Sequence, residues 1–185
     1  EALAGKLTKD EIKLLPTSFD VIGSIAIFND FSVKLKKREN LIGKTLMKLN
    51  KNIKTVAKKT KKYSGKFRLA KIKVIAGKKT NETLHKENGV LLKLDVEKCY
   101  FSPRTANERF RIARLVKNNE SILVFFSGVA PFPCVIAKNS KVKDVYGIEL
   151  NKKAHKYGLE NVKLNKLDNV KLFNGDVNKL VPKII

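Results

Sequence analysis

The chain has 185 residues, and 43% of them are hydrophobic, which is enough for a folded core and excludes a disordered tail. Its 40 Lys and Arg residues outnumber 17 Asp and Glu, and the formal net charge of +23 indicates a polyanionic partner, with nucleic acid as the leading candidate. No run of eighteen apolar residues and no signal peptide is visible, so we expect no membrane contact and a cytoplasmic location.

The first half of the chain has the pattern of a small domain that mixes helices with antiparallel strands. Asn88-Gly89 is a strong turn signal and predicts a hairpin around it. The other expected elements are a helical lead-in at 1–16, a strand at 19–27 broken at Gly23, an amphipathic helix at 32–49 and strands between 67 and 96. We therefore expect a first domain of the α+β class at residues 1–100.

The densest basic segment is residues 51–66, KNIKTVAKKTKKYSGK. One interpretation is a solvated strand and loop rich in lysine. The other is an edge that follows the phosphate groups of a nucleic acid. The overall charge supports both interpretations equally. If the segment follows phosphate groups, the residues that contact them would be Lys58, Lys59, Lys61 and Lys62.

Beyond residue 100 the periodicity alternates between helix and strand. The expected order is helix 102–116, strand 121–126, helix 131–138, strand 144–150, helix 152–165 and strand 170–173. Such alternation is typical of the opening half of a doubly wound parallel sheet, so we expect an α/β second domain at residues 101–185.

Ligands of a doubly wound sheet bind beyond the carboxyl ends of its strands. The small-residue turn 127–130 follows the first strand and would let a cofactor approach the backbone closely. Glu149 ends the second strand, where a carboxylate can accept two ribose hydroxyls, and Asp176 follows the third. Together they predict a site for a nucleoside cofactor, and the spacing excludes a Walker phosphate loop.

The segment 100–111, YFSPRTANERFR, places arginines and one carboxylate at the start of a helix. Ser102 is the expected N-cap and Pro103 the first helical residue. Arg104 and Glu108 then lie four residues apart on one face. They form either an exposed ion pair or a base and a cation that serve one site.

The two cysteines, Cys99 and Cys134, have no metal-ligand spacing around them. We expect both to be buried, reduced thiols, and we expect no metal site.

Seven segments stand out together: SFDVIGSIAI (18–27), GKFR (65–68), AGKKTNETLHKENG (76–89), DVEKCYFSPRTANER (95–109), FFSGVAPF (125–132), VYGIELN (145–151) and NGDVNKL (174–180). In this order and spacing they resemble the archaeal and eukaryotic tRNA (guanine-37-N1)-methyltransferase family, over nearly all of the chain from Leu14 onward. The resemblance implies a Rossmann-like class I methyltransferase sheet that uses S-adenosyl-L-methionine. It also implies methylation of N1 of guanosine 37 in the anticodon stem-loop of tRNA.

The resemblance further implies roles for single residues. Guanine N1 carries a proton at neutral pH, so methylation requires a base for that proton and a cation for the charge that develops on O6. By motif position, Glu108 corresponds to the base and Arg68 to the cation. Tyr100, Arg104 and Arg109 correspond to contacts with the tRNA and with a target base that leaves its stack.

The cofactor-binding residues implied by the resemblance are Phe126, Ser127, Gly128, Ala130, Glu149 and Asp176. Two positions depart from the family pattern: Val124 stands where the family has Asp, and Ala130 stands where it has a second Gly. The methyl of Ala130 could therefore crowd the cofactor. The sequence also lacks the Asn-Pro-Pro or Asn-Leu-Pro loop of the family, which suggests a fragment, an inactive chain, or a second polypeptide that completes the catalytic domain.

Two other functions stay open. A related wyosine-pathway enzyme, either a methyl- or an aminocarboxypropyl-transferase, would keep the same fold and the same tRNA site. An inactive or split RNA-binding fragment would agree with the charge and the missing loop. Cofactor binding distinguishes the fragment from the enzymes, and nucleoside mass spectrometry distinguishes the two enzymes.

Overall fold

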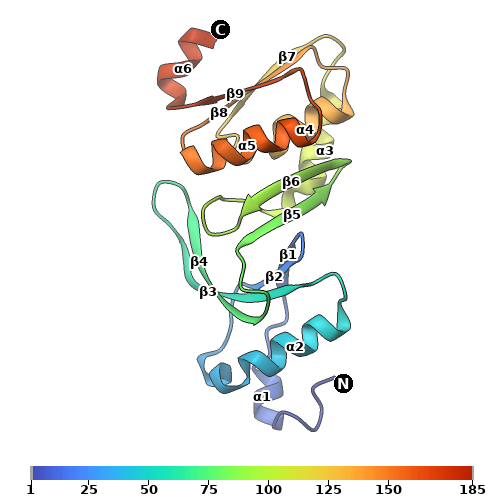
Figure 1. Ribbon diagram of the computed structural model, residues 1–185, viewed down its shortest axis with the longest axis vertical. Helices are drawn as coiled ribbons and strands as arrows, with labels where there is room; N and C mark the ends of the chain where they lie inside the picture. The colour runs from blue at the N-terminus through green and yellow to red at the C-terminus, as the bar shows by residue number, and fades with distance from the viewer. Residues whose placement is uncertain (1, 185) are drawn as a thin grey trace. The chain divides into compact units, whose positions relative to one another are not determined.

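The computed structural model describes residues 2–184, apart from the side chains of residues 62–64. The chain divides into two compact units, Glu1–Thr83 and Leu84–Ile185 (Figure 1). No helix among the described residues is long and apolar enough to cross a membrane.

The first unit is a four-stranded sheet with helices. Its elements are α1 (Lys9–Lys13), β1 (Phe19–Ile22), β2 (Ile25–Phe28), the 3-10 helix η1 (Val33–Arg38), α2 (Glu39–Leu49), β3 (Thr55–Ser64) and β4 (Leu69–Gly77). The strand order is β1-β2-β3-β4. The predicted break at Gly23 is the turn of the hairpin β1–β2, and Gly23 has a φ of +55°.

One strand pair of this sheet differs from the expected antiparallel arrangement. β1–β2 and β3–β4 are antiparallel, but β2 and β3 pair in parallel. The reason is the connection, because η1 and α2 return the chain to the end of the sheet at which β2 began. The predicted amphipathic helix therefore serves as a crossover, and its first turns are 3-10 rather than α-helical.

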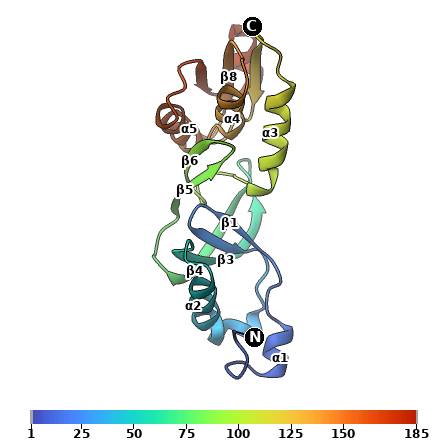
Figure 2. The ribbon, with the colours of Figure 1, turned by 90° about the vertical axis from the view of Figure 1, so that its right-hand side faces the viewer.

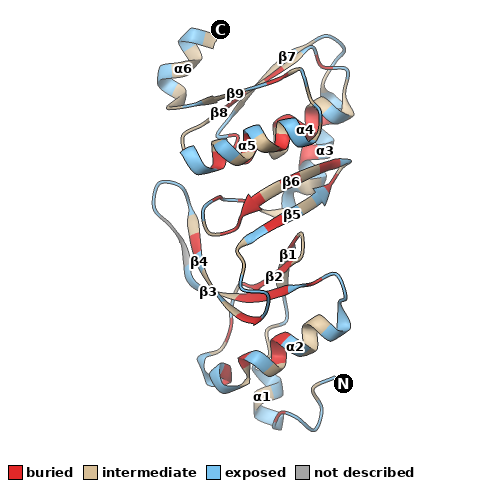
Figure 3. Ribbon diagram, in the orientation of Figure 1, coloured by how far each residue is buried: buried red, intermediate tan, exposed pale blue. Residues whose placement is uncertain are grey.

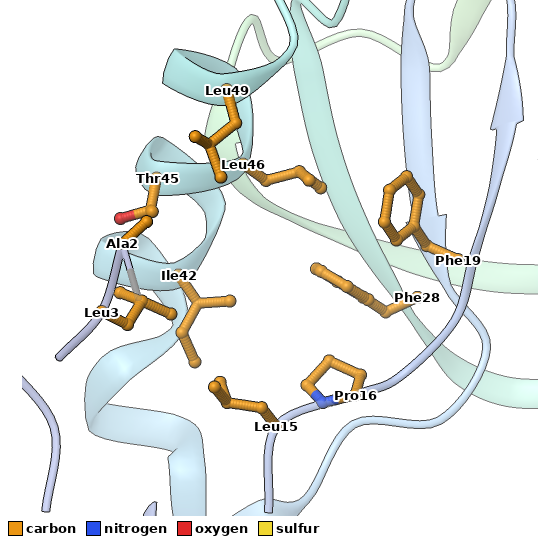
Figure 4. Close-up of a pocket in the computed structure, with 10 residues that line it drawn as sticks. All are labelled: Ala2, Leu3, Leu15, Pro16, Phe19, Phe28, Ile42, Thr45, Leu46 and Leu49. Atoms are coloured by element: carbon orange, nitrogen blue, oxygen red, sulfur yellow. The ribbon is translucent and has the colours of Figure 1, made fainter. Parts of the chain in front are cut away.

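The core of the first unit lies between α2 and the sheet. Leu35 and Val56 are fully buried there, together with Ile42. Helix α2 approaches β4 closely at Gly43, where an added Cβ would lie 2.6 Å from the Cβ of Ala76. Beside this core, an apolar pocket of about 290 Å³ opens between the N-terminal segment, α2 and the hairpin β1–β2 (Figure 4).

The second unit combines a hairpin with a parallel sheet. Its elements are β5 (Glu82–Glu87), β6 (Val90–Asp95), η2 (Pro103–Thr105), α3 (Ala106–Leu115), β7 (Ser121–Phe125), α4 (Pro131–Asn139), β8 (Asp144–Glu149), α5 (Lys152–Leu164), β9 (Val170–Asn174) and α6 (Val177–Ile184). Strands β7, β8 and β9 are neighbours in that order and pair in parallel. The predicted alternation and the predicted turn between β5 and β6 are both confirmed.

Helices α4 and α5 lie between the parallel sheet and the hairpin β5–β6 (Figures 1 and 2). The side of α5 that meets the hairpin carries asparagines. Asn161 accepts from the amide of Lys93 (2.7 Å) and donates to its carbonyl (3.0 Å), and Asn165 bonds the amide and carbonyl of Leu91 in the same way (2.8 and 2.7 Å). The side chains of α5 thus pair with β6 as a neighbouring strand would.

The hydrogen bonds between α5 and β6 explain why the boundary between the two units lies at the start of the hairpin β5–β6. We predicted that the first domain would extend to residue 100, but the structure groups the hairpin β5–β6 and the loop after it with the parallel sheet. Leu92 and Leu94 of β6 are fully buried, in keeping with this packing. Figure 3 shows β6 as a strand of buried and intermediate residues. The sequence gives no local sign of it, because the partners of β6 lie on α5.

Candidate functional site

The turn after β7 has an unusual backbone. Phe126, Gly128 and Ala130 all have positive φ (54°, 57° and 64°). The turn is held by the amide of Ser127, which donates to Ile148 O of β8 (2.9 Å), and by the amide of Ala130, which donates to Ser127 O (2.8 Å). Left-handed residues other than glycine cost free energy and gather at functional sites, so this turn is a candidate binding site.

Glu149, at the end of β8, faces this turn. Its Oε2 accepts from the amide of Gly128 (2.7 Å), and its Oε1 accepts from the amide of Asn151 (2.6 Å). Each carboxylate oxygen keeps a second lone pair, so the acid is held in place and can still accept hydrogen bonds from two ribose hydroxyls. The carboxylate is half-buried.

Apart from Phe126, which is 76% exposed, the side chains of the turn are buried and leave room beside its backbone. An added Cβ on Gly128 would meet only Tyr100 O, at 3.8 Å. Ser127 and Ala130 are buried, the first near Gly147 and the second near Gly158 on α5. The methyl of Ala130 therefore packs inside the fold.

Asp176 follows β9 at the same edge of the sheet. Its Oδ1 accepts from the amide of Asn178 (2.9 Å) at the start of α6. The chain just before it is tied to β8, because Asn174 Nδ2 and the amide of Gly175 both donate to Glu149 O (2.7 and 3.0 Å). The structure thus places the three predicted strand ends side by side.

Glu108 lies in the first turn of α3, with its side chain about half exposed. Its predicted partner was Arg104, but the bidentate ion pair of Glu108 is with Arg111, at 2.7 Å for both hydrogen bonds. These bonds lower the pKa of Glu108 below its ordinary value. The group is therefore a carboxylate at neutral pH, the form that a general base requires. Ser102, the expected N-cap, makes no side-chain cap.

Arg109 does not lie where a contact with tRNA would need it. Only 2% of its surface is exposed, because its guanidinium is buried against Glu87 of the hairpin. Its neighbour Glu108 faces solvent from the same helical turn. We therefore correct the predicted role of Arg109: a buried, paired guanidinium cannot reach a phosphate or a base.

The first unit carries Arg68 and the basic hairpin β3–β4. Arg68 is exposed in the turn between these strands, has a φ of +50°, and its amide donates to Gly65 O (3.0 Å). Lys58 instead pairs with Glu39 (2.7 Å), and its side chain is only 15% exposed, so it is not part of an exposed phosphate edge. Lys61 is exposed, whereas the side chain of Lys62 lies outside the described residues.

Residues 83–185 match the protein-family model of the TRM5/TYW2 methyltransferase domain, and residues 1–80 match the family model of the TYW2 N-terminal domain. A tRNA (guanine(37)-N(1))-methyltransferase, Trm5b of Pyrococcus abyssi, is 42% identical over 171 residues, which are 92% of this chain and 51% of the relative. The chain belongs to the TRM5/TYW2 methyltransferase family. It spans about half the length of this relative.

Solved structures of the TRM5/TYW2 family agree with this assignment. A complex of aTrm5 with tRNALeu has a TM-score of 0.81 and 35% identity, covering 93% of this chain and 51% of that one. Methanocaldococcus jannaschii TYW2 in complex with AdoMet has a TM-score of 0.60 and 31% identity, covering 86% and 57%. The resemblance read from the sequence is thereby confirmed.

Two further predicted site residues are Tyr100, in the loop before η2, and Arg104, within η2. Tyr100 is 40% exposed, and its carbonyl lies beside Gly128, so the loop before α3 runs along the turn after β7. Asn151 anchors that loop by donating to Lys98 O (2.8 Å). Arg104 is exposed.

The sequence did not identify three groups that shape the site. Glu87 holds Arg109, Arg111 holds Glu108, and Asn161 donates to Val129 O in the turn after β7 (2.9 Å). The spacing of Glu108 and Arg111 is a helical i, i+3 spacing and could have indicated their pair. Nothing local indicates the other two, because their partners are distant in the sequence.

The thiols of Cys99 and Cys134 are free and buried, as predicted. Burial raises the pKa of each to about 12. Neither is a nucleophile at neutral pH.

Proposed function

We propose that this chain binds S-adenosyl-L-methionine and tRNA and that its residues carry the methylation of N1 of guanosine 37. The observation that carries the proposal is the position of Glu149. Its two carboxylate oxygens accept hydrogen bonds from backbone amides beside a glycine turn whose backbone is accessible. The turn and the acid fit a nucleoside cofactor, because the backbone at Gly128 is accessible and the carboxylate can still accept from a ribose.

In the proposed reaction the cofactor, when bound, supplies a methyl group on a sulfonium. Glu108 takes the N1 proton of the target guanine, and its lowered pKa keeps it in the carboxylate form for that step. Arg68 would stabilise the negative charge that develops on O6. Exposed Tyr100 and Arg104 would contact the flipped base and its neighbours. Arg111 donates to both carboxylate oxygens of Glu108, so Glu108 must accept the N1 proton while it is paired with Arg111.

The charge supports tRNA as the partner. With a net charge of +23, the release of counterions from phosphates contributes much of the free energy of binding. From residue 55 to residue 77 the hairpin β3–β4 contains no acidic residue, and its exposed cations include Lys61, Lys66, Arg68 and Lys71.

We propose that further strands complete the catalytic sheet. Within the described residues β7 is an edge strand, which is unusual for the first strand of a doubly wound sheet. Phe125 at its end is 48% exposed, and Leu123 is half-buried. A second polypeptide is one possible source of those strands, and continuation of the same chain is the other.

A wyosine-pathway enzyme is the second candidate. It is favoured by the match of residues 1–80 to the TYW2 N-terminal domain. The same cofactor site and the same tRNA would serve it. Mass spectrometry of nucleosides from treated tRNA would show 1-methylguanosine for the first function and an aminocarboxypropyl or methyl addition to a tricyclic base for the second.

The test of the cofactor site is titration calorimetry with S-adenosyl-L-methionine. Glu149→Ala should lose the ribose contacts and bind at least tenfold more weakly, since one or more charge-assisted hydrogen bonds are removed. Glu160→Ala on α5 is the control, because Glu160 pairs with Lys93 away from the turn. Equal affinity of Glu149→Ala and the parent would refute the ribose site.

A further inference from the structure

Arg109 is enclosed by a set of polar and aromatic partners. Its Nε and NH2 donate to the two carboxylate oxygens of Glu87, at the end of β5. Its NH2 also donates to Ser102 O (3.1 Å), and its NH1 donates to Thr105 Oγ1. The guanidinium thus joins the hairpin β5–β6 to the 3-10 turn that begins the α3 segment.

Two aromatic rings complete the enclosure. The guanidinium carbon lies 5.1 Å from the ring centroid of Phe101 and 5.9 Å from that of Phe132. His85 packs against Phe101, with ring centroids 5.1 Å apart, and its Nε2 lies 3.3 Å from Glu87 Oε2. Burial disfavours the charged form of Glu87, but hydrogen bonds from His85 and Arg109 outweigh it and lower its pKa.

A second bond fixes the same turn. Asn88, in the turn of the hairpin, donates from Nδ2 to Ala106 O (2.8 Å), the first residue of α3. The start of α3 is therefore held to the hairpin at Ala106 and Arg109, and Arg109 in turn holds Thr105. Glu108 lies within this fastened segment and points outward.

A buried ion pair is a poor device for stability, because desolvation of two charges offsets most of their attraction. Its value is geometric, since a bidentate guanidinium accepts its partner in one orientation only. A Leu or Met at position 109 could fill the space but could not bond Ser102 O and Thr105 Oγ1.

We propose that Arg109 and Glu87 are positioning residues that fix the first turn of α3, so that Glu108 and Arg104 are held in the geometry of the transfer reaction. The inference deepens the proposed function and rests on it for the link to rate. The fixed turn itself does not depend on it. The two parts can therefore be tested separately.

The first measurement is hydrogen exchange in this chain, which needs no substrate. Arg109→Lys keeps the charge but loses the bidentate fork, and Glu87→Gln keeps hydrogen bonding but loses the charge. Both should raise exchange at the amides of residues 106–110 by tenfold or more and leave β7, β8 and β9 protected. Arg114→Lys on the exposed side of α3 is the matched control. A uniform loss of protection across the unit, or no change at 106–110, would overturn the inference.

The second measurement is the single-turnover rate of methyl transfer in a preparation that contains the complete catalytic domain. A displacement of about 1 Å can cost about 10²-fold in rate, so Arg109→Lys should lose rate on that order while cofactor and tRNA affinities stay within threefold of the parent. Loss of affinity without loss of rate would show that Arg109 binds substrate and would overturn the positioning role. If the parent transfers no methyl group to tRNA, the proposed function fails, and hydrogen exchange still decides whether the pair fixes the turn.

Discussion

The amide of Gly128 donates to Glu149 Oε2 over 2.7 Å, although 21 positions separate the two residues in the chain. The bond joins the turn after β7 to the end of β8 before any ligand arrives. A carboxylate that is already oriented loses little side-chain freedom when a ribose binds to it. The site is therefore pre-organised by its own backbone.

Replacement of the general base is the most direct test of the chemistry. Glu108→Gln keeps the size of the side chain but cannot accept the N1 proton, and general-base catalysis is worth about 10²–10⁴-fold. We expect the single-turnover rate to fall by about that factor with unchanged affinities for tRNA and cofactor. Asn107→Ala, exposed on the same turn, is the control. A near-normal rate in Glu108→Gln would show that Glu108 is not the general base and that its role is an exposed ion pair with Arg111.

The pair of Glu108 and Arg111 predicts a pH effect. Arg111 lowers the pKa of Glu108, so the active carboxylate persists to more acidic pH than it would alone. In Arg111→Ala that pKa should rise toward its ordinary value, and the acidic limb of the pH–rate profile should move to higher pH. Rates measured across the acidic range would check this. An unmoved limb would mean that a different group controls the profile.

Binding of tRNA should depend on the exposed lysines of the hairpin β3–β4. Each phosphate contact contributes about one to the slope of log affinity against log salt, so replacing Lys61, Lys66 and Lys71 with Gln should reduce that slope by about three. Lys58→Gln is the comparison, because Lys58 pairs with Glu39 and should barely change the slope. Filter binding at several salt concentrations measures both. A larger effect from Lys58 than from the triple variant would be evidence against this surface.

Asn161 should matter for stability. It is fully buried and bonds Lys93 N, Lys93 O and Val129 O. Asn161→Ala leaves these backbone groups unpaired at about 1–3 kcal/mol each, so we expect a loss of about 3 kcal/mol or more in the free energy of unfolding. Urea denaturation would measure it. Asn178→Ala on exposed α6 should stay within about 0.5 kcal/mol of the parent.

The sequence by itself was sufficient for features that depend on local pattern. Alternating helical and strand periodicity after residue 100 predicted the parallel sheet, and Asn88-Gly89 predicted the hairpin turn, where both residues have positive φ. The strand ends at Ser127, Glu149 and Asp176 followed from the same pattern, since parallel strands end at one edge of a sheet. These inferences need only the spacing of residues along the chain.

The tertiary structure decided which charged side chains are available. Arg109 and Glu108 are adjacent in the sequence, yet one is buried against Glu87, 22 positions away, and the other is exposed. Lys58 likewise belongs to a basic run in the sequence, but its ion pair with Glu39 keeps its side chain away from the surface. The physical reason is the cost of burying an unpaired charge: a cation enters the interior only where the fold brings a carboxylate to meet it, and distant partners of this kind leave no periodic trace in the sequence.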